Sequence, residues 1–105
     1  MAKFLFSVNF LQAGVQGAIK EGFAAREAYV RQFVEEQGAK VEAMYWAYGD
    51  HDVILVIDAS QAAAVAISLA VNASGALKLT TTPLMTSVEM DDARGQMPNF
   101  RPPGA

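Results

Sequence analysis

The stretch "YWAYGDHDVILVID", residues 45–58, decides the fold class, because it has the pattern of two strands joined by a tight turn. The run after the turn is rich in Val and Ile, which favour strands. Gly49 and Asp50 separate the two runs. A glycine at the first position of a two-residue turn predicts a type II′ turn with a positive φ at Gly49. The stretch therefore predicts a β-hairpin whose strands span residues 40–48 and 52–58.

The register of this hairpin predicts apolar side chains on both of its faces. On one face it pairs Tyr48 with His51, Trp46 with Val53 and Met44 with Leu55. The other face carries Tyr45, Ala47, Asp52, Ile54 and Val56. An antiparallel sheet with one face in water should instead alternate apolar and polar residues. We therefore expect something to cover each face.

The residues before the hairpin predict a strand and a helix. Residues 3–10 alternate in the manner of a strand, and three glycines in residues 11–22 predict a loop with a short helical turn. Residues 23–37 have the pattern of an amphipathic helix that ends at Gly38. The expected buried stripe of this helix is Tyr29, Val30, Phe33 and Val34, with Arg26, Glu27, Arg31, Glu35 and Glu36 on other sides.

After the hairpin, Ser60 is placed to cap a second helix that Gly75 ends. A last strand is expected over residues 77–90, where Pro83 indicates a bulge or an edge strand. We therefore expect a single domain over residues 1–90 and a C-terminal arm, rich in Pro and Gly, over residues 91–105.

The expected order of elements, β-α-β-β-α-β, predicts an α+β protein with the ferredoxin-like fold. This fold is a four-stranded antiparallel sheet with two helices on one face. Because the hairpin is apolar on both faces, the simplest cover for the second face is another copy of the same sheet. We expect a homodimer or a multiple of one.

Composition limits the partners and the location. The 105 residues include no Cys and have a net charge of −3, with no basic cluster to follow a nucleic acid backbone. Hydrophobic residues make up 52% and charged residues only 18%, which suits a chain that hides surface in an assembly. No apolar run approaches the roughly 18 to 20 residues that span a bilayer. We expect a cytoplasmic protein that binds neither nucleic acid nor membrane.

The residues Gly49, Asp50, His51 and Asp52, with "MYWAY" before them and "VILVIDA" after them, resemble the signature of the GYD domain family. Further similarity is carried by "NFLQAGV", by Arg26, by Gly38 and by "LKLTTTPLM", so the resemblance covers residues 2–90. His51 stands where the family usually has Tyr. The resemblance implies a dimeric α+β barrel, a group that includes cofactor-independent monooxygenases, isomerases and sensing domains, and it implies no particular activity.

The hairpin supplies the candidate site residues. Trp46, Tyr48 and His51 share one face in the predicted register and are the candidate ligand-binding residues. That face is either the helix side of the sheet, where they would be core, or the cavity between subunits. His51 and Asp52 are the candidate catalytic residues, because either could move a proton.

Each of these residues also has a structural interpretation. Gly49, Asp50 and Asp52 are expected to form the turn, with Asp52 accepting hydrogen bonds from backbone amides. His51 could equally be a solvent-exposed residue at the end of the hairpin. The sequence contains no nucleophile with a partner base, no trusted metal-ligand spacing and no phosphate loop.

The sequence predicts a homo-oligomeric domain that binds or senses a small apolar or aromatic molecule, without a cofactor or metal. One alternative is a cofactor-independent monooxygenase or isomerase that acts on an aromatic or conjugated substrate. The other alternative is a purely structural oligomer.

Overall fold

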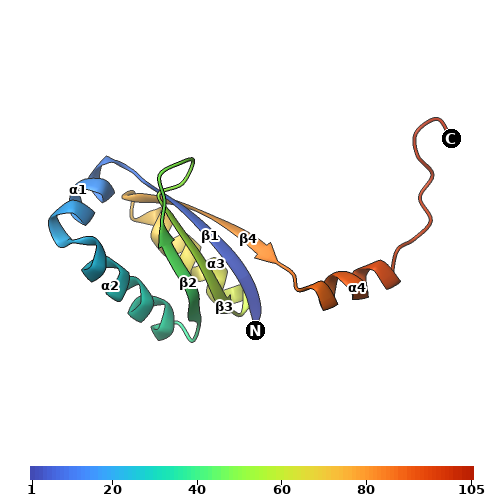
Figure 1. Ribbon diagram of the computed structural model, residues 1–105, viewed down its shortest axis with the longest axis horizontal. Helices are drawn as coiled ribbons and strands as arrows, with labels where there is room; N and C mark the ends of the chain where they lie inside the picture. Colours follow the sequence, from blue (N-terminus) through green and yellow to red (C-terminus); the bar gives the residue numbers. More distant parts are fainter.

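A computed structural model describes residues 1–105 and shows a four-stranded antiparallel sheet with four helices (Figure 1). Along the chain the elements are β1 (Ala2–Phe10), α1 (Gln12–Glu21), α2 (Phe23–Glu36), β2 (Lys40–Trp46), β3 (Val53–Ala59), α3 (Gln61–Ala73), β4 (Leu77–Leu84) and α4 (Ser87–Gly95). In the sheet the strands lie in the order β2-β3-β1-β4. The α+β class and the four antiparallel strands are as predicted from the sequence.

The hairpin of β2 and β3 confirms the predicted register but not the predicted turn. Met44 pairs with Leu55 and Trp46 pairs with Val53. The strands stop before the expected turn, and the amide of Ala47 donates to the carbonyl of Asp52 at 2.8 Å. Four residues, 48–51, therefore form the loop. A loop of this length turns without a left-handed residue, and Gly49 has no positive φ, so the type II′ prediction was wrong.

The segment predicted as a loop before α2 is the ten-residue helix α1. Two glycines lie inside this helix, and each lowers intrinsic helix stability by about 1 kcal/mol relative to Ala. Contacts with the rest of the fold offset that cost. A Cβ atom at Gly14 would lie 2.1 Å from the carbonyl oxygen of Ala76, so only glycine lets α1 lie this close to the start of β4. Ala18 on the same helix is buried.

The sequence correctly predicted α2 and α3 from the residues that cap or end them. Gly38 follows α2 with a φ of 77°, and Gly75 follows α3 with a φ of 75°, as expected for glycines that end helices. The hydroxyl of Ser60 accepts a hydrogen bond from the amide of Ala63 at 3.1 Å and so caps α3. None of the helices is long and apolar enough to cross a lipid bilayer.

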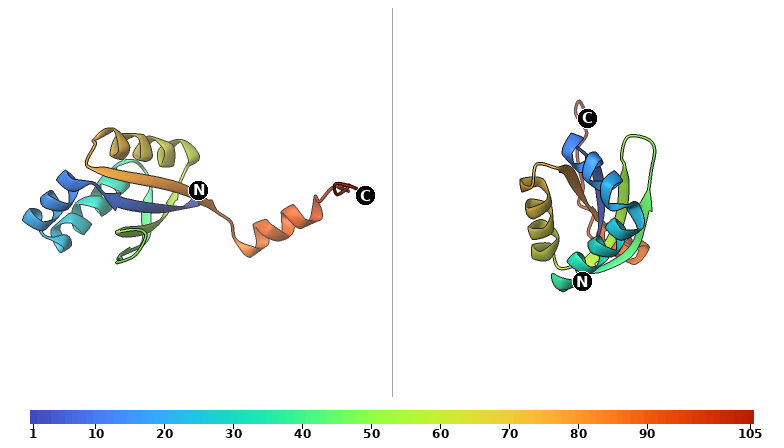
Figure 2. Two further views of the ribbon diagram at one scale, coloured as in Figure 1. Left: turned by 90° about the horizontal axis from the view of Figure 1, so that it is seen from above. Right: turned by 90° about the vertical axis from the view of Figure 1, so that its left-hand side faces the viewer.

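The core lies between the sheet and the two helices α2 and α3, which cover the same face (Figure 2). Alternate residues of the two central strands supply its centre, namely Phe4, Phe6 and Val8 of β1 and Val53, Leu55 and Ile57 of β3. Val34 of α2 and Ile67 of α3 pack against them. Phe6 and Ile57 are almost completely buried, so this face carries most of the hydrophobic stabilisation.

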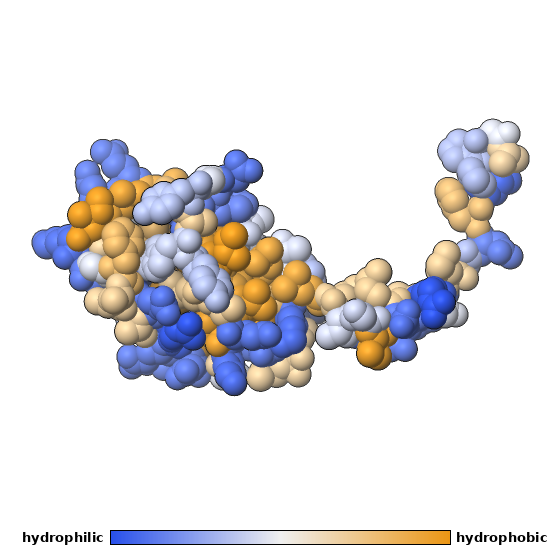
Figure 3. Space-filling model, viewed as in Figure 1, coloured by the Kyte–Doolittle hydropathy of each residue, from blue (hydrophilic) through white to orange (hydrophobic).

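The opposite face of the sheet, called here the open face, carries the intervening residues. By the strand register its centre consists of Leu5 and Ser7 of β1, Ala43 and Tyr45 of β2, and Ile54 and Val56 of β3. No helix packs on it, and Figure 3, viewed from this side, shows hydrophobic atoms at its centre. Tyr45 is 72% exposed, while Ile54 and Val56 are only partly covered by their neighbours.

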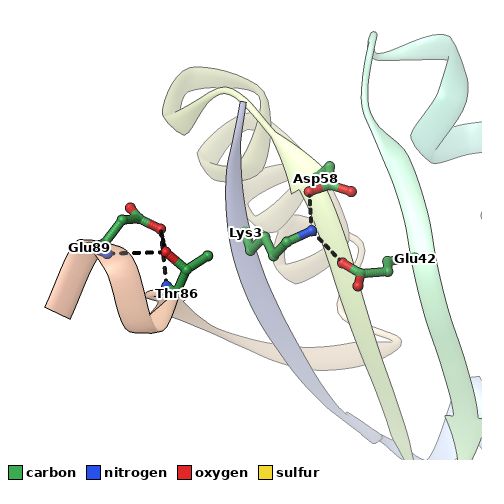
Figure 4. A network of polar contacts seen from close by, with 5 residues as sticks. All are labelled: Lys3, Glu42, Asp58, Thr86 and Glu89. Atoms are coloured by element: carbon green, nitrogen blue, oxygen red, sulfur yellow. Dashed lines mark hydrogen bonds and ion pairs between the residues drawn. The ribbon is translucent and has the colours of Figure 1, made fainter. Parts of the chain in front are cut away.

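A charged cluster lies at one end of the open face (Figure 4). The Nζ atom of Lys3 lies 2.7 Å from a carboxylate oxygen of Glu42 and 2.8 Å from one of Asp58. Hydrogen bonds to Asp58 and then to Glu42 raise the pKa of Lys3 above its usual range. Glu42 is the extra residue where the pairing of β2 with β3 shifts, between Val41 and Ala43. The open face thus has an apolar centre and a charged end.

The last strand is shorter than predicted. It ends at Leu84, and residues 87–95 form α4 instead of continuing the strand. Thr86 and Glu89 form a capping box that starts this helix, and hydrogen bonds from Thr86 lower the pKa of Glu89 (Figure 4). Pro83 lies in the edge strand β4, as expected for a proline, because it has no backbone N–H to donate to a neighbouring strand.

The segment after β4 projects away from the domain (Figure 1). No residue of α4 is buried, and the residues beyond it form no further helix or strand. The radius of gyration is 17.1 Å, well above the value of about 13 Å that a compact domain of this length would have. The segment from Met85 onward therefore lies outside the packed sheet and helices.

We predict that alanine at the two glycines of α1 has opposite effects on stability. Gly14→Ala should lower the free energy of unfolding by roughly 1 to 3 kcal/mol, because its methyl group collides with the Ala76 carbonyl. In Gly17→Ala no atom lies within 4 Å of the added Cβ, so this variant should raise the free energy of unfolding by about 0.5 to 1 kcal/mol. Urea unfolding at one protein concentration measures both. Equal stability of the two variants would refute the close contact of α1 with Ala76.

Candidate functional site

A hollow beside the apolar core, called here the main cavity, lies between α2, α3 and the helix-covered face of the sheet. Its volume is about 240 Å³. Its floor includes core residues such as Phe6, Val8 and Leu55, and its sides are the facing surfaces of α2 and α3. All but two of the 18 lining residues are hydrophobic. An apolar hollow with few polar groups is the usual form of a small-molecule site.

The two polar residues of the main cavity are Arg26 of α2 and Ser74 after α3. The hydroxyl of Ser74 donates to the carbonyl of Val71 and accepts from the amide of Ala76, so it serves the end of its own helix. The Arg26 side chain is only 28% exposed. It supplies the one charged group of the cavity.

A second cavity of about 410 Å³ lies beside α1, at the hairpin end of the sheet. Its apolar lining includes Val15 and Ile19 of α1, and its one polar residue is Asp52. Two aromatic residues, Phe10 and Trp46, line both cavities. They form the wall that the main and second cavities share.

A third aromatic ring, that of Phe23, packs against this shared wall from the second cavity. Trp46 stacks on Phe10 with ring centroids 6.1 Å apart, and the ring of Phe23 meets Trp46 edge-on at 4.9 Å. Offset stacks and edge contacts of this kind are favourable for aromatic pairs. Trp46 therefore lies on the helix side of the sheet, which is one of the two positions the sequence left open, and there it also faces both cavities.

The structure does not bring Trp46, Tyr48 and His51 together on one face. Tyr48 lies in the loop and is fully exposed, although it borders the second cavity. The Nδ1 atom of His51 lies 2.8 Å from the side-chain oxygen of Asn9. Asn9 alternates with the core residues of β1, so this contact is on the side of the open face. The expected shared face is lost because the strands end before Tyr48.

The hairpin loop is tied to the end of β1 by polar contacts. A carboxylate oxygen of Asp52 accepts a hydrogen bond from the amide of Phe10 at 2.8 Å. The side-chain amide of Asn9 donates to the carbonyl of Asp50 at 2.7 Å. In addition, the amide of Asp52 donates to the carbonyl of Val8. These bonds hold Phe10 beside Trp46 and so position the shared wall.

The chemistry available to the two cavities is limited. A guanidinium presents only N–H donors and no acceptor, so Arg26 cannot act as a base in the main cavity. In the second cavity the Asp52 carboxylate already accepts the Phe10 amide. No three side chains of the kinds that ligate metals come together in the structure. The arrangement is suited to binding an apolar molecule.

Sequence reasoning missed Phe10, Phe23 and Arg26 as lining residues. For Arg26 a signal was present, since it lies three, four and seven residues before apolar positions that line the same cavity. Those positions are Tyr29, Val30 and Phe33. Residues at such spacings share one face of a helix, so a charge there interrupts an apolar stripe. Phe10 and Phe23 carried no comparable signal, because their contact with Trp46 depends on how distant segments meet.

These features define a small α+β domain with an apolar cavity between its sheet and its helices. The family model described as GYD domain matches residues 4–93, and the chain belongs to the GYD domain family. This confirms the resemblance seen in the sequence. Comparisons with curated proteins and with solved structures gave no match.

We predict that Asp52 stabilises the hairpin through the Phe10 amide. Asp52→Ala leaves this partly buried donor without its partner and should lower the free energy of unfolding by about 1 to 3 kcal/mol. Asp52→Asn retains an acceptor oxygen and should therefore lower the free energy of unfolding clearly less than Asp52→Ala does. Thermal and urea unfolding measure both changes.

The matched control for this prediction is Asp50→Ala, because the Asp50 side chain forms no hydrogen bond and lies exposed in the same loop. Its effect should stay within about 0.5 kcal/mol. If Asp52→Ala proved as mild as Asp50→Ala, the carboxylate would have no structural role.

Proposed function

We propose that this protein is a homo-oligomeric domain that binds a small apolar or aromatic molecule in the main cavity. The observation that carries the proposal is the cavity of about 240 Å³, lined almost wholly by hydrophobic side chains, between α2, α3 and the sheet. Concave sites with a mostly apolar lining and few polar groups are the usual form of small-molecule sites, so this hollow favours a ligand.

The volume of the cavity suits a ligand smaller than most drugs, whose sites span roughly 300 to 1,000 Å³. The aromatic residues Phe10, Tyr29, Phe33 and Trp46 line it and can stack on a flat ring. Among the residues proposed from the sequence, Trp46 keeps the role of ligand contact. Tyr48 is left as a residue at the rim of the second cavity, and His51 as a partner of Asn9.

The alternative of a cofactor-independent monooxygenase or isomerase has less support from the geometry. Such an enzyme needs a group that can take a proton from the bound substrate. His51 does not line the main cavity, and Asp52 lies at the second cavity with its carboxylate engaged. The alternative of a purely structural oligomer leaves the main cavity unexplained.

We also propose that the domain forms a homodimer through its open face, as a dimeric α+β barrel. The strand order β2-β3-β1-β4, with α2 and α3 on one face, suits a ferredoxin-like unit of the predicted β-α-β-β-α-β order, to which α1 is added. The centre of the open face is apolar, with Leu5, Ile54 and Val56 in adjacent strands. In a dimer this centre would be covered by its copy.

The layout of the open face matches that of an interface. Interfaces have an apolar core with a polar rim, and aromatic residues such as Tyr are enriched in them. Here the exposed Tyr45 and the half-buried Val56 lie near the centre. The Lys3 cluster lies at one end, and Asn9 with His51 lies at the other. A two-fold arrangement would pair the apolar centres and leave the charges at the rim in water.

We predict that a neutral aromatic probe, 2-naphthamide, binds the main cavity. The chain has a single Trp, so one indole N–H signal in a ¹H–¹⁵N NMR spectrum reports on the cavity wall. This signal should shift with saturable dependence on 2-naphthamide, and the melting temperature should rise because the probe binds only the folded form.

The matched variants for this test are two alanines of α3. Ala70 lines the main cavity, so Ala70→Phe should obstruct it and remove the shift. Ala62 is exposed on the same helix and does not line the cavity, so Ala62→Phe should bind as the wild type does. If wild-type protein shows no saturable shift, or if both variants bind equally, the proposed site is wrong.

We predict that aspartate at the centre of the open face dissociates the dimer. Sedimentation equilibrium of the wild type should give a dimer or a multiple of it at micromolar concentration. Tyr45→Asp should give a folded monomer of about 11.2 kDa, because Tyr45 is 72% exposed in the single chain and its loss costs the monomer little. Val56→Asp should also dissociate the dimer and should lower the stability of the monomer.

The control is Val65→Asp on the outer side of α3, where the side chain is 47% exposed and lies off the open face. This variant should remain a dimer. A wild-type protein that sediments as a stable monomer would overturn the proposed assembly while leaving ligand binding untouched.

A further inference from the structure

Arg26 is a charged residue in the wall of an otherwise apolar cavity. Its guanidinium carbon lies 4.7 Å from the centre of the Tyr29 ring, a cation–π contact that holds the side chain along α2. The nearest carboxylate oxygen belongs to Glu21 and lies 3.9 Å away, which is too far for a hydrogen bond. The guanidinium therefore has a defined position while its N–H donors remain without acceptors in the protein.

An arginine in this state is suited to bind an anion. A guanidinium presents five N–H donors and binds a carboxylate through two parallel hydrogen bonds, which are stronger than bonds between neutral groups. The Glu21 carboxylate at 3.9 Å is an ion-pair partner but leaves the N–H donors of Arg26 without a hydrogen bond, so a carboxylate bound within hydrogen-bond distance would stabilise the partly buried charge further. The other polar residue of the cavity, Ser74, is engaged by Val71 and Ala76 and does not compete.

The local electrostatics also favour a negative group beside Arg26. The first turn of α2 contains no acidic residue and no side chain caps its N-terminus, and the one carboxylate close to Arg26 is that of Glu21, at 3.9 Å, before the helix begins. The free amides there carry the positive end of the helix dipole. Arg26 follows directly, as the fourth residue of the helix. One guanidinium matches one carboxylate, whereas a doubly charged phosphate would leave part of its charge unpaired.

We propose that the main cavity binds an aromatic carboxylic acid, with its rings among the apolar side chains and its carboxylate on Arg26. This inference rests on the proposed function and names the class of ligand. An apolar cavity of about 150 Å³ holds a benzene molecule. The volume of about 240 Å³ here accommodates about two fused rings. The aromatic walls formed by Phe10, Phe33 and Trp46 favour flat rings over branched chains.

The test compares two probes of the same shape, 2-naphthoate and 2-naphthamide, by titration calorimetry with the full chain. Wild-type protein should bind the acid at least about tenfold more tightly than the amide, since a charge-assisted bidentate contact exceeds a neutral one by that margin. Arg26→Gln should reduce this preference to about one by weakening the acid alone, with the amide affinity within about twofold of the wild type.

The matched control is Arg31→Gln, because Arg31 lies on the same helix, outside the main cavity, and pairs with Glu27. This variant should keep the preference for the acid. A measurement on wild-type protein covers the case in which Arg26→Gln does not fold. The Nε–Hε signal of Arg26 in a ¹H–¹⁵N spectrum should shift on addition of 2-naphthoate and stay in place with 2-naphthamide.

The outcomes separate this inference from the proposed function. If the amide binds and the acid binds no better, or if Arg26→Gln keeps the preference, the inference is overturned and the binding site itself survives. If neither probe binds, both the inference and the proposed binding function are overturned. A preference for the acid that disappears in Arg26→Gln and persists in Arg31→Gln establishes the carboxylate contact.

Discussion

The antiparallel pairing of β1 with β3 is the constraint on which the rest of the structure depends. It aligns Phe6 with Leu55 and Phe4 with Ile57, so the large side chains of both central strands lie on one face. Two helices cover that face, but they lie over opposite edges of the sheet. The helix α2 lies beside β2 and the helix α3 lies beside β4. Because the helices stand apart over an apolar floor, a cavity remains between them. The same alternation leaves Val56 on an uncovered face.

The polar ties of the hairpin connect the fold to the cavity. Asp52 accepts the amide of Phe10, and Phe10 stacks on Trp46, so the loop holds the wall between the two cavities in place. Asp52 is thereby a residue that positions an aromatic ring. The charge that faces the main cavity comes from Arg26, on the other side of the wall from the hairpin loop. The aromatic wall and the charged residue of the main cavity thus come from different segments.

Features that depend on neighbours in the chain were predictable. The register of the hairpin follows from period-two alternation, which places Trp46 opposite Val53. The ends of the helices follow from Gly38, Gly75 and the hydroxyl of Ser60, because capping is a contact within a few residues. The family was also recognisable, since its hairpin residues are contiguous. Of the candidate site, Trp46 was identified from the sequence as an aromatic residue beside the turn.

Features that depend on distant segments were decided only by the tertiary structure. The helix α1 forms despite its glycines because Gly14 lies against Ala76, which is 62 residues later in the chain. The loop at Gly49 is wider than the shortest turn, and β1 holds it through the Asn9 side chain and the Phe10 amide, which donate hydrogen bonds to Asp50 and Asp52. The sequence determined the alternation and the caps, since these are local. The tertiary structure decided which helix surface faces which strand, and hence that Arg26 lines a cavity, because packing joins residues that no local pattern relates.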